Sequence, residues 1–145
     1  MAEQLNAKRL YAAVDAFNDG GYEDLDQFIA DDIVWHVGGN HPLSGIYRGR
    51  TAVAEYHQRA AALCDGPLQI EPTEVIAGKN NVAVFLRVHG QRAGRTLDVG
   101  MAEMITLDQE GRWLEFRALS DEQDQIDAFW SAALVDLRPS DATSV

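Results

Sequence analysis

The sequence predicts an α+β fold in which helices pack on one face of a curved antiparallel sheet. Up to residue 64 most apolar residues recur at helical spacing, with one short β-branched run between them. From residue 68 to residue 119 the spacing changes to about two, and a helical pattern returns from residue 126. A curved sheet wrapped around helices forms a cone-shaped α+β barrel, and we expect its apolar interior to be a small-molecule pocket.

Length and composition favour one globular domain. The chain has 145 residues, of which 46% are hydrophobic and 24% are charged. We expect one domain over residues 1–136 and a flexible tail over residues 137–145. The longest apolar runs, such as Val82–Leu86, are too short for a helix that spans a bilayer.

The charge of the chain is strongly acidic. It has 23 acidic and 12 basic residues, which gives a formal net charge of −11. An acidic surface repels the phosphates of nucleic acids and anionic lipids, so we expect neither nucleic acid nor a membrane as a partner. The first eight residues lack the apolar core of a signal peptide, so we expect a cytoplasmic protein.

We expect neither a metal nor a cofactor. Cys64 is the single cysteine, and the four histidines show no close metal-ligand spacing. The pair Gly38-Gly39 lacks the spacing and the lysine of a phosphate-binding loop. A nucleophile elbow of the type G-x-S-x-G is also absent from the sequence.

Helical spacing predicts three helices in the first half of the chain. The first ends at Gly20-Gly21, and the second runs from about Tyr22 to Ile29. The third begins near Thr51, a residue type that often caps helices, and ends at residues 65–67. The apolar faces of the first and third helices are Leu10, Ala13, Val14 and Phe17, and Val53, Tyr56, His57, Ala60, Leu63 and Cys64.

The remaining pattern predicts five strands and a last helix. The run Ile33–Val37 is β-branched and aromatic, and a loop rich in turn formers follows it. Four further strands, joined by hairpin-type turns, form an antiparallel meander: Leu68–Ile76, Val82–His89, Thr96–Leu107 and Trp113–Leu119. The last helix has one apolar face, made of Ile126, Phe129, Trp130, Ala133 and Leu134.

The order of these elements and several short motifs resemble the SnoaL-like branch of the nuclear-transport-factor-two-like superfamily. The matching stretches are residues 30–37, 42–45, 47–50, 108–112, 120–123 and 127–130. The resemblance covers roughly residues 10 to 130 and implies a cone of the cystatin-like or NTF2-like type. This superfamily includes polyketide cyclases, ketosteroid isomerases, limonene epoxide hydrolases, dehydratases and non-catalytic binders, so the fold does not choose the activity.

Glu103 is the most informative single residue. One face of its strand carries Leu97, Val99, Met101, Glu103 and Ile105, so a single carboxyl group lies on an otherwise apolar face. If this face lines the pocket, Glu103 is neutral and donates a hydrogen bond to an oxyanion or acts as a general acid. If the opposite face lies inside, Glu103 is solvated or pairs with an arginine. The position also resembles that of the oxyanion-binding aspartate in ketosteroid isomerases.

The resemblance also bears on which chemistry is possible. The proton-shuttling aspartate and the tyrosine of ketosteroid isomerases fall on Val37 and Ala13, so the chain lacks that pair. Asp121 resembles the base of SnoaL-like cyclases, and Arg87 and His89 resemble the arginine–aspartate pair of limonene epoxide hydrolase. The alternative for Asp121 is a helix cap within Ser120–Gln123.

The phase of the strand around residue 87 leaves two alternatives. If Leu86 and Val88 face the pocket, then Arg87 and His89 face outward, because side chains alternate along a regular strand. Only a bulge would change this. Alternation and the third-helix stripe further predict that six side chains line one cavity, as catalytic or substrate-binding groups: Trp35, Val37, Tyr56, Met101, Glu103 and Phe116.

We therefore expect a cofactor-independent enzyme that acts on a hydrophobic small molecule by acid/base proton transfer, as cyclases and isomerases do. The expected base is Asp121, His89 or, in third place, His36, and Glu103 or Arg87 would stabilise the oxyanion. The alternatives are water activation of the epoxide hydrolase type and a binding or dimerisation module without catalysis. Several strands are apolar on both faces: Ala83 and Phe85 lie on one face of their strand, and Val84 lies on the other. A second apolar face needs a partner, so we also expect a homodimer through the sheet.

Overall fold

The computed structural model describes the backbone of residues 1–136 and the side chains of residues 1–131. The expected tail at residues 137–145 and the expected apolar residues Ala133 and Leu134 lie outside this description. In chain order the elements are α1 (Ala2–Gly20), α2 (Tyr22–Leu25), the 3-10 helix η1 (Asp26–Phe28), β1 (Ile29–Val37), β2 (Gly45–Arg48), α3 (Gly49–Leu63), β3 (Gln69–Ala77), β4 (Asn81–Arg92), β5 (Arg95–Leu107), β6 (Trp113–Leu119) and α4 (Gln123–Asp136).

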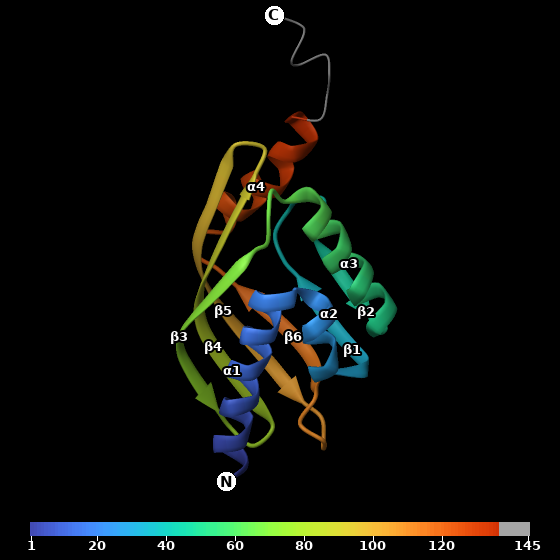
Figure 1. The fold of residues 1–145 in the computed structure, drawn as a ribbon, viewed down its shortest axis with the longest axis vertical. Helices are drawn as coiled ribbons and strands as arrows, with labels where there is room; N and C mark the ends of the chain where they lie inside the picture. The colour runs from blue at the N-terminus through green and yellow to red at the C-terminus, as the bar shows by residue number, and fades with distance from the viewer. Residues whose placement is uncertain (137–145) are drawn as a thin grey trace, which may run out of the picture.

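The strands form one open, curved sheet in the order β2-β1-β6-β5-β4-β3. The antiparallel meander β3 to β6 that the sequence predicts is confirmed, and so is the α+β fold class. The early strand β1 joins this meander by parallel pairing with β6, and β2 pairs antiparallel with the other side of β1. The helices lie on the concave side of the sheet, with α1 and α2 in front of it and α4 at its upper end (Figure 1).

The segment around β1 and β2 differs from the sequence expectation. The second helix is shorter than predicted, because β1 already begins at Ile29, whose side chain is fully buried. A register shift between Ile29 and Val34 lets both ends of β1 pair with β6. The four residues of β2 precede the predicted start of the third helix near Thr51, and no strand was predicted there. They pair with residues 34–37 instead.

Alternation on β4 and β5 decides which side chains face the helices. On β4 the inward residues are Val84, Leu86 and Val88, of which the first two are buried. The antiparallel register sets Val84 opposite Glu103 and Leu86 opposite Met101. Glu103 therefore lies on the concave face, with apolar neighbours on both adjacent strands.

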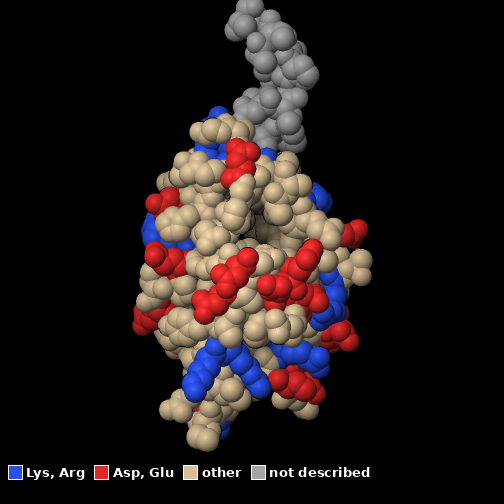
Figure 2. Space-filling view, viewed as in Figure 1, with Lys and Arg blue, Asp and Glu red and all other residues tan. Residues whose placement is uncertain are grey.

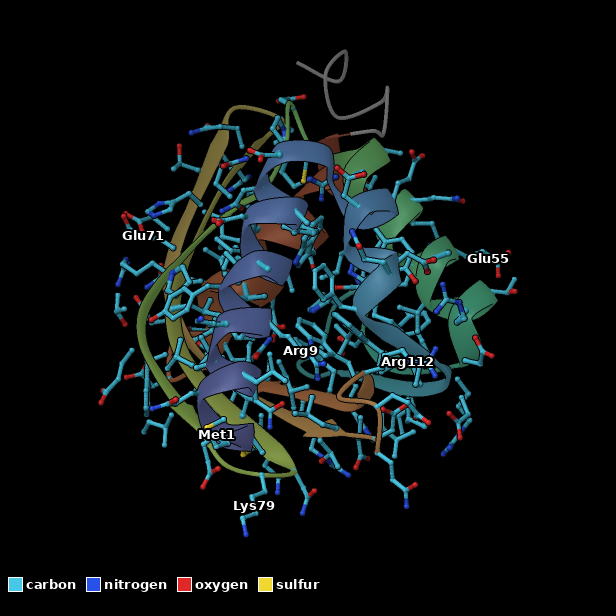
Figure 3. The ribbon with its side chains drawn as sticks, turned by 60° about the horizontal axis from the view of Figure 1, so that its bottom comes forward. Met1, Arg9, Glu55, Glu71, Lys79 and Arg112 are labelled. Carbon is cyan, nitrogen blue, oxygen red and sulfur yellow. The ribbon has the colours of Figure 1, made fainter. Side chains whose placement is uncertain are left out.

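Contacts from α1 close the narrow end of the cone. The side-chain amide of Asn6 donates hydrogen bonds to the carbonyls of Gly78 and Lys79, at 2.9 and 3.0 Å, in the turn between β3 and β4. Arg9 donates to the carbonyl of Glu110 in the turn between β5 and β6. Figure 3 shows this end, with Arg9 beside the turn that carries Arg112. Both turns are thus attached to one helix.

The buried Arg92 joins the elements at the opposite end. Its side chain is only 2% exposed. The guanidinium donates to the carbonyl of Leu63, at the end of α3, and to the carbonyls of Phe129 and Trp130 on α4. It also lies over the rings of Phe129 and Trp130, at 5.7 and 5.3 Å from their centroids. One residue of β4 therefore fixes the positions of two helices.

Candidate functional site

A cavity of about 250 Å³ lies between the helices and the concave face of the sheet. Residues from α1, α2, β1, α3, β3, β4, β5, β6 and α4 contribute to its wall, and most of them are apolar. A hollow opens on the face that α1 and α2 cover, and Asp and Glu side chains gather below it (Figure 2). The rim at this end includes Gly21 and Tyr22, which follow α1 in the chain.

All six side chains that were predicted to line one cavity do line it: Trp35, Val37, Tyr56, Met101, Glu103 and Phe116. Alternation places Trp35 and Val37 on the concave side of β1. The register of β5 with β6 places Glu103 and Phe116 on the same side. Ala13 and Val37, which stand at the positions of the isomerase pair, also lie on this wall. What these residues do toward a ligand stays a prediction.

Aromatic rings form much of the wall. Trp35 stacks on Phe116, with 3.8 Å between the ring centroids, and the ring of Trp113 lies parallel to both at 6.1 Å. Tyr56 and Tyr47 pack together at 4.9 Å. Flat, polarisable walls of this kind favour aromatic or polycyclic ligands, because ring–ring contacts add to the burial of apolar area.

Glu103 is the acidic group in this apolar wall. Burial raises the pKa of its carboxyl to about 8, because an ionised carboxylate loses its hydration there. No described side chain forms a hydrogen bond or an ion pair with it. At neutral pH Glu103 is therefore a neutral acid with an O–H that is available to a ligand.

Two neighbours on α3 add polar atoms to the wall. Burial, reinforced by Tyr47 and Glu103, raises the pKa of Tyr56, so its hydroxyl stays protonated. Burial lowers the pKa of His57 to about 4, so its imidazole is neutral at pH 7. His57 was noted as part of the helical stripe but was not among the predicted site residues. A lone histidine in such a stripe usually packs in the core, and its cavity placement depends on tertiary structure.

The expected group of Arg87, His89 and Asp121 does not reach the cavity. Arg87 and His89 point away from the helices on the outer face, where both contact Asp98, at 2.9 and 3.3 Å. The physical reason is the alternation of β4, which buries Val84 and Leu86 on the other face and places Val88 there as well. Each such burial contributes about 1.5–3 kcal/mol, whereas burying an unpaired charge costs more.

Asp121 lies exposed beside a shallow depression on the same outer face. Its expected place as a base of the cavity is therefore wrong, because Asp121 lines this outer depression and does not contribute to the cavity wall. Its alternative as the helix cap is not seen either. Ser120 accepts the hydrogen bond from the backbone N–H of Glu122, and the Glu122 carboxylate accepts one from the N–H of Gly100 at 2.8 Å.

No three His, Cys, Asp or Glu side chains come together as a metal site within the described part of the chain. Within the same range, no helix has both the length and the apolar character needed to cross a membrane. The cavity wall holds neither Lys nor Arg among its described residues. The chemistry of the cavity thus depends on a few polar groups, chiefly Glu103 and the histidine and tyrosine side chains of the wall.

Comparison with known proteins identifies the family. A sequence model of the SnoaL-like domain matches residues 8–116. The chain belongs to this family. An uncharacterised protein of Mycobacterium tuberculosis is similar to this SnoaL-like protein, with 29% identity over 118 residues, 80% of this chain and 88% of the relative.

Solved structures share the fold of this SnoaL-like protein. Bal32a, from a soil-derived mobile gene cassette, has a TM-score of 0.83 at 24% identity, over 90% of this chain and 99% of the other. A Xanthomonas campestris protein of unknown function with a cystatin-like fold has a TM-score of 0.80 at 28% identity, over 87% and 98%. An NTF2-like protein, a protein assigned as a polyketide cyclase and an epoxide hydrolase/cyclase-like enzyme share the fold at 18–24% identity. Likeness at that level shows the fold alone.

Proposed function

We propose that this SnoaL-like protein binds an uncharged hydrophobic small molecule in the cavity and catalyses proton transfer on it without a cofactor. The observation that carries this proposal is Glu103, a neutral carboxylic acid without a partner in an apolar, aromatic wall. Such a group donates a hydrogen bond to the carbonyl oxygen of a ligand. This bond strengthens when charge develops on the oxygen, and the enolate is stabilised.

The charge around the cavity supports an uncharged ligand. Between residues 10 and 47 the chain has seven Asp or Glu residues and neither Lys nor Arg. This stretch includes α2 and the end of α1, next to the hollow with its acidic surroundings (Figure 2). An anionic ligand would be repelled at the opening and would find neither Lys nor Arg among the described wall residues.

Enolate formation is the step that aldol cyclisation and double-bond isomerisation share. A carbon next to a carbonyl loses a proton, the electron pair of the C–H bond forms a carbon–carbon double bond, and the π electrons of the carbonyl group move onto its oxygen. The fold is shared with a protein assigned as a polyketide cyclase, which agrees with this reaction class without deciding it. The epoxide hydrolase-like alternative has less support, because the residues that suggested it, Arg87, His89 and Asp121, lie outside the cavity.

Binding without catalysis is the second candidate function. The observation in its favour is the wall itself, since the stacked rings of Trp35, Trp113 and Phe116 can hold an apolar ligand without any proton transfer. The two candidates predict the same binding and different chemistry. One assay must therefore measure both properties on the same compound.

The bicyclic ketone 2-tetralone is a suitable probe, because it is uncharged and its carbons next to the carbonyl exchange protons. Its binding is followed by tryptophan fluorescence, since three tryptophans line the cavity. Proton NMR in D2O then measures the exchange of its hydrogens for deuterium. The proposal predicts saturable binding and an exchange rate at least about 100-fold above the buffer rate at saturation.

Two substitutions at the same position separate binding from catalysis. Glu103→Gln keeps a hydrogen-bond donor, but an amide N–H is a much weaker acid than a carboxylic O–H and stabilises an enolate oxygen less. Binding should therefore stay within about 3-fold of wild type while exchange falls about 100-fold. Glu103→Leu should weaken both. Binding of 2-tetralone without exchange above the buffer rate would reject the catalytic proposal and leave the binding module.

A further inference from the structure

A hydrogen bond within α3 fixes the tautomer of His57. Its Nδ1 lies 2.9 Å from the carbonyl oxygen of Val53, one turn earlier in the helix. A carbonyl only accepts, so Nδ1 carries the proton and donates it to this bond. The other nitrogen, Nε2, then has no proton and presents a lone pair.

Aromatic neighbours hold the ring in one orientation. Tyr22 stacks on it, with 4.3 Å between the centroids. The rings of Trp35 and Tyr56 meet it edge to face, at 4.9 and 4.8 Å. All four rings belong to the cavity wall. The imidazole therefore cannot turn away from the cavity without breaking several contacts.

Nε2 is available to a ligand. No described side chain forms a hydrogen bond with it, and it is not among the buried polar atoms that lack a partner. Nε2 is therefore accessible, and His57 belongs to the cavity wall. Five further titratable residues contribute to the described wall: Tyr22, His36, His41, Tyr56 and Glu103. Burial lowers the pKa of His41 as well. Nε2 of His36 is already paired with the Glu115 carboxylate at 2.8 Å, so it is not open to a ligand in the way that Nε2 of His57 is.

We propose that His57 is the proton acceptor of the cavity and that Glu103 is the matching donor, so the ligand is an uncharged ketone with hydrogen on the carbon next to its carbonyl. This inference rests on the proposed function for the place of the carbonyl at Glu103. It assigns the base that Asp121 and His89 were expected to provide. It also narrows the ligand class from hydrophobic molecules in general to enolisable ketones.

The proton transfer balances within the chain and the ligand. Nε2 of His57 takes the proton from the carbon, and the C–H electron pair becomes the carbon–carbon double bond of the enolate. The carbonyl electrons move to oxygen, where the Glu103 O–H stabilises them by a hydrogen bond. The imidazolium then returns the proton to the same carbon or to the far end of a conjugated system. A weak base is sufficient where a neutral acid stabilises the oxyanion.

The pH dependence of exchange follows from the two groups. With a pKa of about 4, His57 accepts protons above that pH, and with a pKa of about 8, Glu103 donates a hydrogen bond below that pH. The exchange rate of bound 2-tetralone should therefore rise through about pH 4, stay level, and fall through about pH 8. Tyr56 stays protonated over this range.

Replacement of His57 by phenylalanine tests the proposal. His57→Phe keeps an aromatic ring against Tyr22 and removes Nε2. We expect binding of 2-tetralone within about 3-fold of wild type, at least about 100-fold slower exchange, and loss of the acid limb of the pH profile. His89→Gln, which removes a histidine from the outer face, is the matched control and should exchange at the wild-type rate.

A second measurement needs no catalysis. The hydroxyl of 2-naphthol can donate to Nε2, whereas 2-methoxynaphthalene has no such donor. Wild type should prefer 2-naphthol by about 3- to 10-fold, and His57→Phe should bind both equally. Equal binding by wild type, or a preference that survives in His57→Phe, overturns the role of His57 whatever the catalysis.

The outcomes separate the two proposals. Full exchange in His57→Phe with loss of exchange in Glu103→Gln overturns the inference and leaves the proposed function standing. No exchange by wild type rejects the proposed function and the role of His57 as a base together. In that case the naphthol preference still decides whether Nε2 accepts a hydrogen bond from a ligand. Circular dichroism on each variant confirms that it is folded.

Discussion

Trp35 and Phe116 are partners in the parallel pairing of β1 with β6, and their rings stack with 3.8 Å between the centroids and 13° between the planes. Both rings face the cavity, and both are buried in the same hydrophobic cluster. The stack of these two rings thus forms part of the cavity wall and also joins β1 to the meander. Changes in this wall affect stability as well as binding.

Truncation of either ring should destabilise the fold. We expect Phe116→Ala to lower the free energy of unfolding by about 3–5 kcal/mol, because it removes buried contacts and leaves a cavity. Urea denaturation followed by circular dichroism measures this loss. The control is Tyr11→Ala on α1, whose ring is 48% exposed and which should change stability by less than about 1 kcal/mol. Equal effects of the two substitutions would contradict the role of the stack.

The raised pKa of Glu103 makes stability depend on pH. In the unfolded chain this carboxyl ionises near its ordinary value of 4.5, whereas in the native state it stays protonated up to about pH 8. Between these values the native state binds more protons, so its stability falls as pH rises. Relative to Glu103→Gln, wild type should lose up to about 1.4 kcal/mol for each pH unit in this window.

Denaturation of both proteins at pH 4.5, 6 and 8 tests this expectation. The difference between them should be smallest at the lowest pH and largest at the highest. Glu55→Gln is the matched control, because Glu55 points away from the molecule on α3 (Figure 3) and is exposed. A wild-type curve parallel to that of Glu103→Gln at all three pH values would show that the carboxyl is ionised in the native state.

Asp121 should be dispensable. It lies outside the cavity, and no hydrogen bond or ion pair of its side chain is found among the described residues. We expect Asp121→Asn to exchange 2-tetralone at the wild-type rate and to change the free energy of unfolding by less than about 0.5 kcal/mol. A loss of exchange of about 100-fold or more would place the base at this end of the sheet after all.

The outer face of the sheet carries an exposed apolar patch, made of Ile76, Phe85, Met104 and Leu119, which are 44–62% exposed. The register makes the patch continuous, because Ala102 lies between Phe85 and Leu119, and Ala83 lies between Ile76 and Met104. Such a patch is unusual on a monomer. We propose that a second copy of this chain covers it, as the sequence predicts, because a symmetric dimer buries the same patch on both copies.

Sedimentation or light scattering tests the dimer. Wild type should have about twice the 16.0 kDa mass of the chain at micromolar concentration. Phe85→Glu places a charge in the middle of the patch and should give a monomer with unchanged helix content. Tyr11→Glu, on α1 and away from this face, should remain a dimer. A monomeric wild type would reject the proposal.

The fold was predictable because alternation and helical spacing act over short distances in the chain. Trp35, Met101 and Glu103 each occupy the inward phase of a strand, so their place on one wall follows from local pattern and from the meander. The four residues of β2 were missed because so short a strand has no periodicity of its own. Its pairing with β1 depends on tertiary contacts.

The polar part of the site was less predictable. The alternation of β4 left two alternatives for Arg87 and His89, and their likeness to a catalytic pair favoured the alternative that the structure excludes. The role of Arg92 could not be expected, since its partners are backbone carbonyls of two helices that are distant in sequence. His57 showed the right helical spacing, but spacing alone does not tell a core residue from a cavity residue.

The interior is divided into two hydrophobic clusters, and Tyr56, Val88 and Met101 pack against both of them. All three also line the cavity, which therefore lies at the boundary between the clusters. A substitution at this boundary reshapes the cavity while most of each cluster stays packed. Descendants of one ancestral chain can thus exchange one ligand for another by few mutations, each of which the fold survives. Divergence of substrate preference within such a scaffold needs no change of topology.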